Sequence, residues 1–281
     1  MSRTGPYDET WQMPDFSGPR YSQSLARGLA IMECFKPGRS VLGIADIADE
    51  LGMSRSTTHR YLTTLVALGY MEQDKSRKYR LSLRVTDLGM SALNSTGLRE
   101  QARSILEDLR RGSNFTVGLA MLDGAEIVYL DQVISFQRGQ DKIDLGVGVG
   151  SRAPAYCTAL GKVLLAHLPE EESRALLLRA SMERRGPNAI AGKEALWAEL
   201  RGVLEEGFAT EDEEFASKRI AIAAPVRDEA GTTIAAIDLS SYSSAITVER
   251  LAAALNPHLI AAADRISARL GYRREDEIAA H

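Results

Sequence analysis

Hydroxyl, imidazole and guanidinium side chains recur at short spacing just after position 53, and this run is the best candidate for chemistry in the chain. A helix that begins at an N-capping serine would present outward the side chains of Ser54, Arg55, Ser56, Thr57, His59 and Arg60. Such side chains donate hydrogen bonds to phosphate oxygens and purine edges, and a helix N-terminus favours an anion. A second cationic group follows at Lys75, Arg77 and Lys78. Both groups indicate contacts with the backbone and bases of DNA.

The elements around these side chains follow the outline of a winged helix-turn-helix. A short helix is expected first, because apolar residues recur at three- and four-residue spacing at Ile44, Ile47, Ala48 and Leu51. Gly52 permits the turn to the next helix, which should run to about position 68 and end at Gly69. Its inward stripe would consist of Thr58, Tyr61, Leu62, Leu65 and Val66. Two strands, 70–71 and 79–83, would then flank the basic hairpin tip.

The alternative is a small helical subdomain whose charged face meets only water. The charge distribution favours DNA instead. The whole chain has 34 basic and 38 acidic side chains and a net charge of −4, whereas residues 20–84 hold 11 basic and 6 acidic ones, a net charge of +5. Because the excess of cations coincides with the predicted helices, residues 21–90 are interpreted as a DNA-binding domain.

Composition limits what the rest of the chain can be. With 281 residues and 44% hydrophobic content, it can form two domains with separate cores. No apolar run approaches a membrane span, which needs about 20 residues, and no secretory signal is visible. A cytoplasmic location with no membrane partner is therefore expected, and Cys34 and Cys157 should be reduced thiols. Residues 1–20 and 273–281 are polar and are interpreted as flexible tails.

Periodicity divides the remaining chain into helices and strands. Helices are expected at 22–35, in PAYCTALGKVLLAHL, EEESRALLLRA and KEALWAELRGVLEEG, and from about 248 to 270. A linker helix is expected at 91–112, on the apolar stripe of 98–111. Strands are expected at 116–123, 126–133 and 142–149, and in a hairpin over 219–241 with its turn at 229–231. Residues 113–272 should therefore form an α+β domain with a central antiparallel sheet flanked by helices.

Catalytic and metal chemistry have little support in this second domain. The four histidines form no H-x-x-x-H pair and the two cysteines no C-x-x-C pair, so neither a metal nor another cofactor is expected. The G-x-S-x-G elbow is absent, and GVGVG at 146–150 lacks the spacing of a dinucleotide loop. Cys157 could be a nucleophile at a helix N-terminus, but without a histidine partner a buried core residue is the preferred interpretation. An enzyme is not expected.

A small-molecule site has better support. Residues 158–161 begin a helix shortly after Pro154, so free backbone N–H groups would face whatever lies above the sheet, and such a helix end accepts a carboxylate. Asp238 and Ser240 are two residues apart on one strand and therefore share a face. Two polar side chains on a helix-covered face indicate either a satisfied internal network or a ligand site.

Four stretches within 21–270 resemble the IclR family of bacterial transcriptional regulators: SLARGLAIMECF, LGIADIADELGMSRSTTHRYLTTLVALGY, RAPAYCTALGKVLLAHL and EDEEFASKRIAIAAPVRDEAGTTIAAIDLS. The resemblance implies an N-terminal winged helix-turn-helix, a linker helix, and a GAF-like effector-binding and oligomerisation domain at 113–272. It also implies homodimers, often paired into tetramers, on a double-stranded DNA operator. The PAYCT-x-x-G form resembles the branch that governs aromatic-acid catabolism through protocatechuate and β-ketoadipate.

The resemblance also implies positions for effector contacts. Backbone amides of Ala159 and Leu160 stand where family members bind a ligand carboxylate, and Asp212 resembles the acidic pocket residue, although Glu211 could take the same alignment. The complete set of expected effector-binding positions is Leu145, Ala153, Cys157, Thr158, Ala159, Leu160, Asp212, Ala221, Asp238 and Ser240.

Ala221 stands where several members carry a cysteine, so one possible contact is lost here. Asp238 and Ser240 stand where some members have two serines, and the carboxylate of Asp238 disfavours an anionic group unless a proton or a cation intervenes.

Arg138 and Arg152 are candidate carboxylate partners, with surface exposure as the alternative for each.

The expected function is that of a sequence-specific DNA-binding transcriptional regulator that responds to a small organic acid, an intermediate of aromatic catabolism. Effector binding would change the spacing of two winged modules in a dimer, and this spacing decides operator affinity. A coupling free energy of about 1–3 kcal/mol would suffice for a response of about 5- to 150-fold. Two alternatives remain open from the sequence: a ligand-independent DNA-binding protein, and a small-molecule enzyme with a DNA-binding module.

Overall fold

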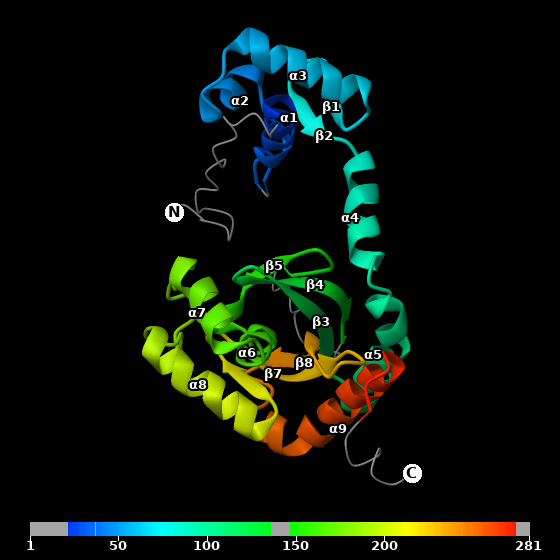
Figure 1. The fold of residues 1–281 in the computed structure, drawn as a ribbon, viewed down its shortest axis with the longest axis vertical. Coiled ribbons are helices and arrows are strands. Elements are labelled where there is room, and N and C mark those ends of the chain that lie inside the picture. The colour runs from blue at the N-terminus through cyan, green and yellow to red at the C-terminus, as the bar shows by residue number, and fades with distance from the viewer. Residues whose placement is uncertain (1–21, 37, 136–146, 274–281) are drawn as a thin grey trace. The chain divides into compact units, whose positions relative to one another are not determined.

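The computed structural model describes residues 22–36, 38–135 and 147–273 (Figure 1). The chain divides into two compact units between Ala92 and Leu93. The N-terminal unit consists of helices and a short hairpin, and the C-terminal unit contains a six-stranded sheet with helices on both faces. The predicted α+β class is confirmed. Within the described ranges, no helix has the length and apolar character needed to cross a membrane.

The N-terminal unit has the predicted winged helix-turn-helix architecture. Its elements are α1 (Gln23–Glu33), α2 (Ile44–Glu50), α3 (Arg55–Ala67), β1 (Met71–Gln73) and β2 (Tyr79–Leu81). The strands pair in antiparallel fashion and form the wing, while α2 packs against α3. Apolar side chains from every element meet in one core, which includes Ile31, Ile47, Leu62, Leu65, Met71 and Tyr79.

Local chemistry fixes the two ends of α3. The hydroxyl of Ser54 accepts a hydrogen bond of 3.2 Å from the amide of Thr57, which makes Ser54 the N-cap as predicted. Gly52 before the helix and Gly69 after it have φ values of +61° and +79°, a backbone conformation that other residues rarely adopt. The inward stripe is narrower than predicted, because Thr58, Leu62 and Leu65 are buried but Tyr61 is half-buried and Val66 exposed.

Two helices occupy the region that the sequence analysis predicted as one linker helix over 91–112. These are α4 (Arg84–Asn94) and α5 (Leu98–Ser113), and Gly97 between them has φ +65°, which does not continue a helix. The apolar stripe of α5 was predicted correctly, but it is buried in the core of the C-terminal unit. Helix α5 therefore belongs to that unit, and α4, which was not predicted, contains the division between the two units.

The C-terminal unit is built on one antiparallel sheet with the strand order β5-β4-β3-β8-β7-β6. The strands are β3 (Thr116–Asp123), β4 (Glu126–Val133), β5 (Arg152–Pro154), β6 (Ala209–Asp212), β7 (Arg219–Arg227) and β8 (Thr233–Tyr242). The predicted strands β3 and β4 and the hairpin of β7 and β8 are confirmed. The strand predicted at 142–149 falls largely outside the described residues, and its described part, 147–149, is not a strand. Strands β5 and β6 were not predicted, because three or four residues carry no readable period.

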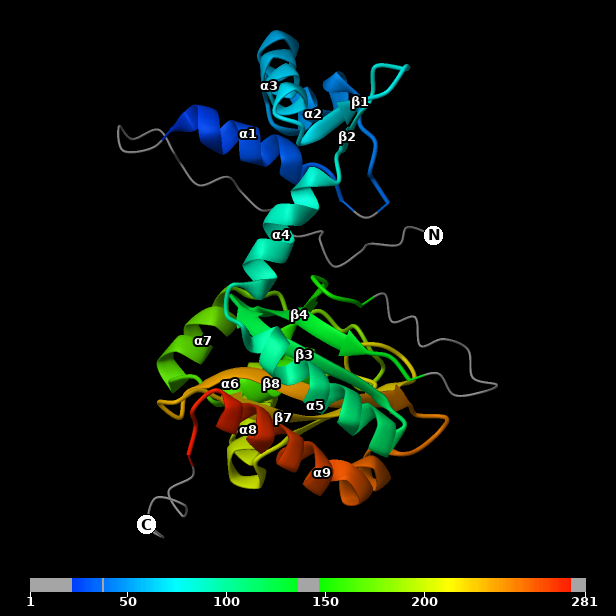
Figure 2. The same cartoon turned by 90° about the vertical axis from the view of Figure 1, so that its right-hand side faces the viewer.

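The two faces of this sheet differ in the size of their side chains. Helices α5 and α9 (Val248–Arg269) lie side by side on one face, where Val, Leu and Ile dominate (Figure 2). Helix α6 (Ala159–Ala166) lies on the other face and packs against α8 (Lys193–Glu206) and α7 (Glu170–Arg179). That face presents small side chains to α6, at Ala120, Ala221, Ala223 and Ala236. The small side chains allow α6 to pack directly on the strands.

Candidate functional site

The outward face of α3 carries the donors that the sequence analysis identified. Arg55, Ser56, His59 and Arg60 are exposed to solvent. The hydroxyl of Ser54 donates a hydrogen bond of 2.8 Å to that of Thr57 while it caps the helix, so these two side chains shape the helix N-terminus. A capped helix end beside two exposed guanidinium groups can bind phosphates and read base edges.

The tip of the wing is a turn held by hydrogen bonds, and its cationic side chains are exposed. One carboxylate oxygen of Asp74 accepts hydrogen bonds from the hydroxyl of Ser76 at 2.7 Å and from the amide of Lys78 at 2.9 Å. These bonds, with the Ser76 hydroxyl first, lower the pKa of Asp74 below its ordinary value. The predicted cations of the tip, Lys75, Arg77 and Lys78, are all exposed. The tip can therefore contact a phosphate backbone.

In the C-terminal unit, the predicted effector positions converge on the α6 face of the sheet. Those at most 3% exposed are Ala153, Cys157, Thr158, Ala159, Leu160, Ala221, Asp238 and Ser240. Leu145 lies outside the described residues. The choice of Asp212 as the inward acid is wrong, because its side chain is exposed and that of Glu211 is fully buried. Neighbouring residues of a strand point to opposite faces, so only one of the two acids can face α6.

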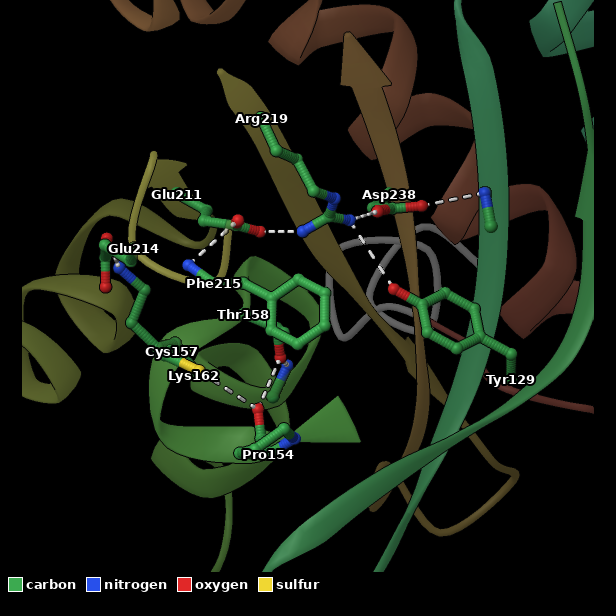
Figure 3. Close-up of polar contacts among 12 residues, drawn as sticks. Tyr129, Pro154, Cys157, Thr158, Lys162, Glu211, Glu214, Phe215, Arg219 and Asp238 are labelled. Atoms are coloured by element: carbon green, nitrogen blue, oxygen red, sulfur yellow. Dashed lines mark hydrogen bonds and ion pairs between the residues drawn. The ribbon is translucent and has the colours of Figure 1, made fainter. Parts of the chain in front are cut away.

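A buried arginine that the sequence analysis missed lies on this face, at the start of β7 (Figure 3). Arg219 is 1% exposed, and its guanidinium is held between two carboxylates. It forms an ion pair with Glu211, and its Nη2 lies 3.1 Å from Oδ2 of Asp238 and 3.5 Å from the hydroxyl of Tyr129. Arg219 is the cation that allows the carboxylate of Asp238 to be buried at this position.

The strand register positions Asp238 for this contact. Gly118 on β3 pairs with Asp238 on β8, and its amide donates a hydrogen bond of 2.8 Å to Oδ1 of Asp238. A Cβ atom at Gly118 would lie 2.5 Å from that oxygen, so only glycine fits opposite this carboxylate. On β7, Arg219 shares its face with Ala221 and Ala223. An arginine in phase with inward alanines was the sequence signal that could have revealed the cluster.

Two carboxylates share one guanidinium here, and burial dominates their titration. It raises the pKa of Asp238 to about 6 and also raises the pKa of Glu211 above its ordinary value. Burial by itself lowers the pKa of Arg219, but Glu211, Tyr129 and Asp238 together raise it above the ordinary range. Around Arg219, the cluster therefore carries an excess of negative charge when both acids are ionised.

A second buried ion pair anchors α6. Lys162 is 0% exposed, and its Nζ lies 2.7 Å from Oε1 of Glu214 and 3.0 Å from Oε1 of Glu199. Burial raises the pKa of Glu214 to about 7. Lys162 and Arg219 thus place two fully buried cations on the same side of the sheet, each compensated by carboxylates.

The first turn of α6 supplies neutral donors. Thr158 caps the helix: its hydroxyl accepts a hydrogen bond of 3.1 Å from the amide of Gly161, and its carbonyl accepts one of 2.9 Å from Lys162. The amides of Ala159 and Leu160 precede these and have no acceptor within the helix. Burial raises the pKa of Cys157 to about 12, so its thiol stays protonated and is unsuited to nucleophilic chemistry.

Two guanidinium groups approach the ring of Phe215. The Cζ atoms of Arg185 and Arg219 lie 5.9 and 5.7 Å from the ring centroid. The Nε atom of each is buried and has no hydrogen-bond partner among the described residues. Arg152, a predicted carboxylate partner, instead pairs with Asp123 and Glu126 at the edge of the sheet. The other candidate, Arg138, lies outside the described residues.

An exposed cationic helix and a basic wing, followed by a separate domain, define a winged helix-turn-helix transcriptional regulator. Comparison with protein families identifies which one. The model of the IclR helix-turn-helix domain matches residues 24–75, and the model of the bacterial transcriptional regulator IclR C-terminal domain matches residues 90–268. The chain belongs to the IclR family, whose members are transcriptional regulators and not enzymes.

Individual relatives cover most of the chain. The Pca regulon regulatory protein of Pseudomonas putida is 33% identical over 88% of this chain and 84% of its own length. The p-hydroxybenzoate hydroxylase transcriptional activator of Acinetobacter baylyi is 32% identical over 82% of this chain and 85% of its own length. Among solved structures, an IclR homologue from Microbacterium hydrocarbonoxydans complexed with 4-hydroxybenzoate is 26% identical, with a TM-score of 0.72 over 88% of this chain and 98% of that one.

Proposed function

We propose that this regulator responds to a small organic acid, an intermediate of aromatic catabolism, which binds in the C-terminal domain and changes operator affinity or promoter activity. The observation that carries the proposal is the set of buried polar groups on the α6 face: Glu211, Arg219, Asp238 and the first-turn amides of α6. A few convergent polar groups in an apolar surrounding are typical of small-molecule sites. Relatives concerned with the Pca regulon and with p-hydroxybenzoate support the aromatic class.

On the DNA side, we propose that α3 enters the major groove of a double-stranded operator. Arg55, Ser56, His59 and Arg60 would contact bases and nearby phosphates, because they are the exposed donors of its first turns. The wing cations would contact the backbone. Regulators of this architecture bind two half-sites as dimers, so we propose a homodimer that can pair into a tetramer.

The decisive experiment is an operator-binding titration with a panel of acids: 4-hydroxybenzoate, protocatechuate, β-ketoadipate, and acetate as a control. We expect one of the first three to change operator affinity by about 5- to 150-fold, which corresponds to a coupling of about 1–3 kcal/mol. The buried and the exposed acid of β6 provide a matched pair of variants. Glu211→Gln should alter the response, whereas Asp212→Asn should preserve it.

The opposite result would favour the ligand-independent alternative. If no acid of the panel changes operator affinity, and calorimetry detects no binding to the free protein, the C-terminal domain does not bind this class of effector. If Asp212→Asn removes the response and Glu211→Gln does not, an effector binds on the exposed side of β6, which contradicts a site on the α6 face.

A further inference from the structure

The unpartnered donors beside Phe215 point to an acceptor that the protein does not itself supply. The Nε atoms of Arg185 and Arg219 are both buried without a hydrogen-bond partner among the described residues, and both guanidinium groups lie within 6 Å of the same ring. A buried donor without an acceptor destabilises the folded protein. Two such donors beside one ring are therefore expected where a bound anion supplies the missing acceptors.

The charges around this ring distinguish the two arginines. Arg219 already forms ion pairs with Glu211 and Asp238, which neutralise its charge. It can therefore offer a ligand a hydrogen bond but no net positive charge. Within the described ranges, the ion pairs of this site join Arg219 and Lys162 to carboxylates and do not include Arg185. Arg185 is therefore the cation whose charge is available to a ligand.

Access also favours Arg185. The side chains of Arg185 and Phe215 are half-buried, whereas Arg219 and its two acids are fully buried. Of this group, the guanidinium of Arg185 and the ring of Phe215 are therefore the parts nearest to solvent. A planar aromatic acid suits this arrangement, because its ring can pack on Phe215 while its carboxylate accepts two parallel hydrogen bonds from a guanidinium.

We propose that Arg185 binds the carboxylate of the effector beside Phe215, with Nε of Arg219 as a second donor. This inference rests on the proposed function, since it assumes that an organic acid binds in this domain. It assigns the charge recognition to an arginine of the segment between α7 and α8. The amides of Ala159 and Leu160 are neutral donors and can bind a further polar group of the ligand.

Calorimetric titration of the full chain tests this assignment with a charged and a neutral probe, 4-hydroxybenzoate and 4-hydroxybenzamide. Arg185→Gln should weaken binding of the acid by about 10- to 150-fold, the range of a charge-assisted hydrogen bond. It should change binding of the amide by less than about 3-fold, which also shows that the variant is folded. Arg184→Gln is the matched control, because Arg184 is the exposed neighbour in the chain and should leave both affinities unchanged.

The outcomes separate the two claims. If wild-type protein binds 4-hydroxybenzoate and Arg185→Gln binds it equally well, the inference is wrong and the proposed function stands. Equal losses for the acid and the amide, or an equal loss in Arg184→Gln, would also overturn it, since the effect would not depend on the charge of Arg185. If wild-type protein binds neither 4-hydroxybenzoate nor protocatechuate but binds β-ketoadipate, the inference is wrong and the proposed function stands. If it binds none of the three acids, both fail.

Discussion

Replacement of Arg219 by methionine tests the electrostatic structure of the buried cluster. The side chain is 1% exposed and is the cation between Glu211 and Asp238. Its removal leaves two buried carboxylates uncompensated, and removing one partner of a buried ion pair costs about 3–5 kcal/mol. In a domain of this size, 1 kcal/mol shifts the melting temperature by about 2–4 °C, so at pH 8 we expect a decrease of about 6–20 °C.

The same reasoning fixes the pH dependence of that loss. At pH 5 the two acids left without Arg219 can take up protons, so the decrease in melting temperature should be smaller than at pH 8. Thermal unfolding can be followed by the fluorescence of Trp197, which lies on α8 of the C-terminal unit. Arg152→Met is the control, because its ion pairs lie at the partly exposed sheet edge and should contribute about 0–1 kcal/mol.

An Arg219→Met melting temperature equal to that of Arg152→Met at pH 8 would refute this reasoning. So would a large loss that is the same at pH 5 and pH 8, because an uncompensated carboxylate must become less unfavourable when it is protonated.

Two further predictions concern proton binding and helix capping. Burial raises the pKa of Asp238 to about 6, so the folded protein binds a proton at this carboxyl more tightly than the unfolded chain does. The stability that results from this proton is present at about pH 4 and should be lost as the pH rises through about 6. Asp238→Asn should flatten that decline in calorimetric unfolding between pH 4 and 8, and an unchanged profile would contradict the assignment. Ser54→Ala removes the N-cap of α3 and should lower the free energy of unfolding of the N-terminal unit by about 0.5–2 kcal/mol in urea, whereas no measurable loss would show that the cap is dispensable.

Elements with a strong local signal could be predicted from the sequence. The cap at Ser54 and the glycines at both ends of α3 fix that helix within a few residues, and the alternation of β7 and β8 around a Gly-containing turn fixes their hairpin. The α5 stripe was also visible, but its assignment to a linker was not correct. A hydrophobic stripe shows that a helix is buried and does not show which domain buries it.

The alternation of β7 could have placed Arg219 on the inward face, but its partners could not be predicted, because they depend on register between strands. Arg219 meets Glu211 across β6 and β7, and Asp238 across β7 and β8, at separations of 8 and 19 residues along the chain. Glu211 and Asp212 are chemically alike and adjacent, and only the pairing of β6 decides which one faces inward. Arg185 lies between α7 and α8, where no periodicity relates it to the sheet.

The most direct test of the account is operator binding by single variants of α3. Genomic fragments selected by the wild-type protein supply the operator. Arg55→Ala and Arg60→Ala should each weaken operator binding by about 1–3 kcal/mol, and Arg80→Ala should have little effect because that exposed arginine is paired with Glu72. Wild-type operator affinity in both α3 variants, with the C-terminal domain folded, would contradict the claim that the outward face of α3 reads DNA.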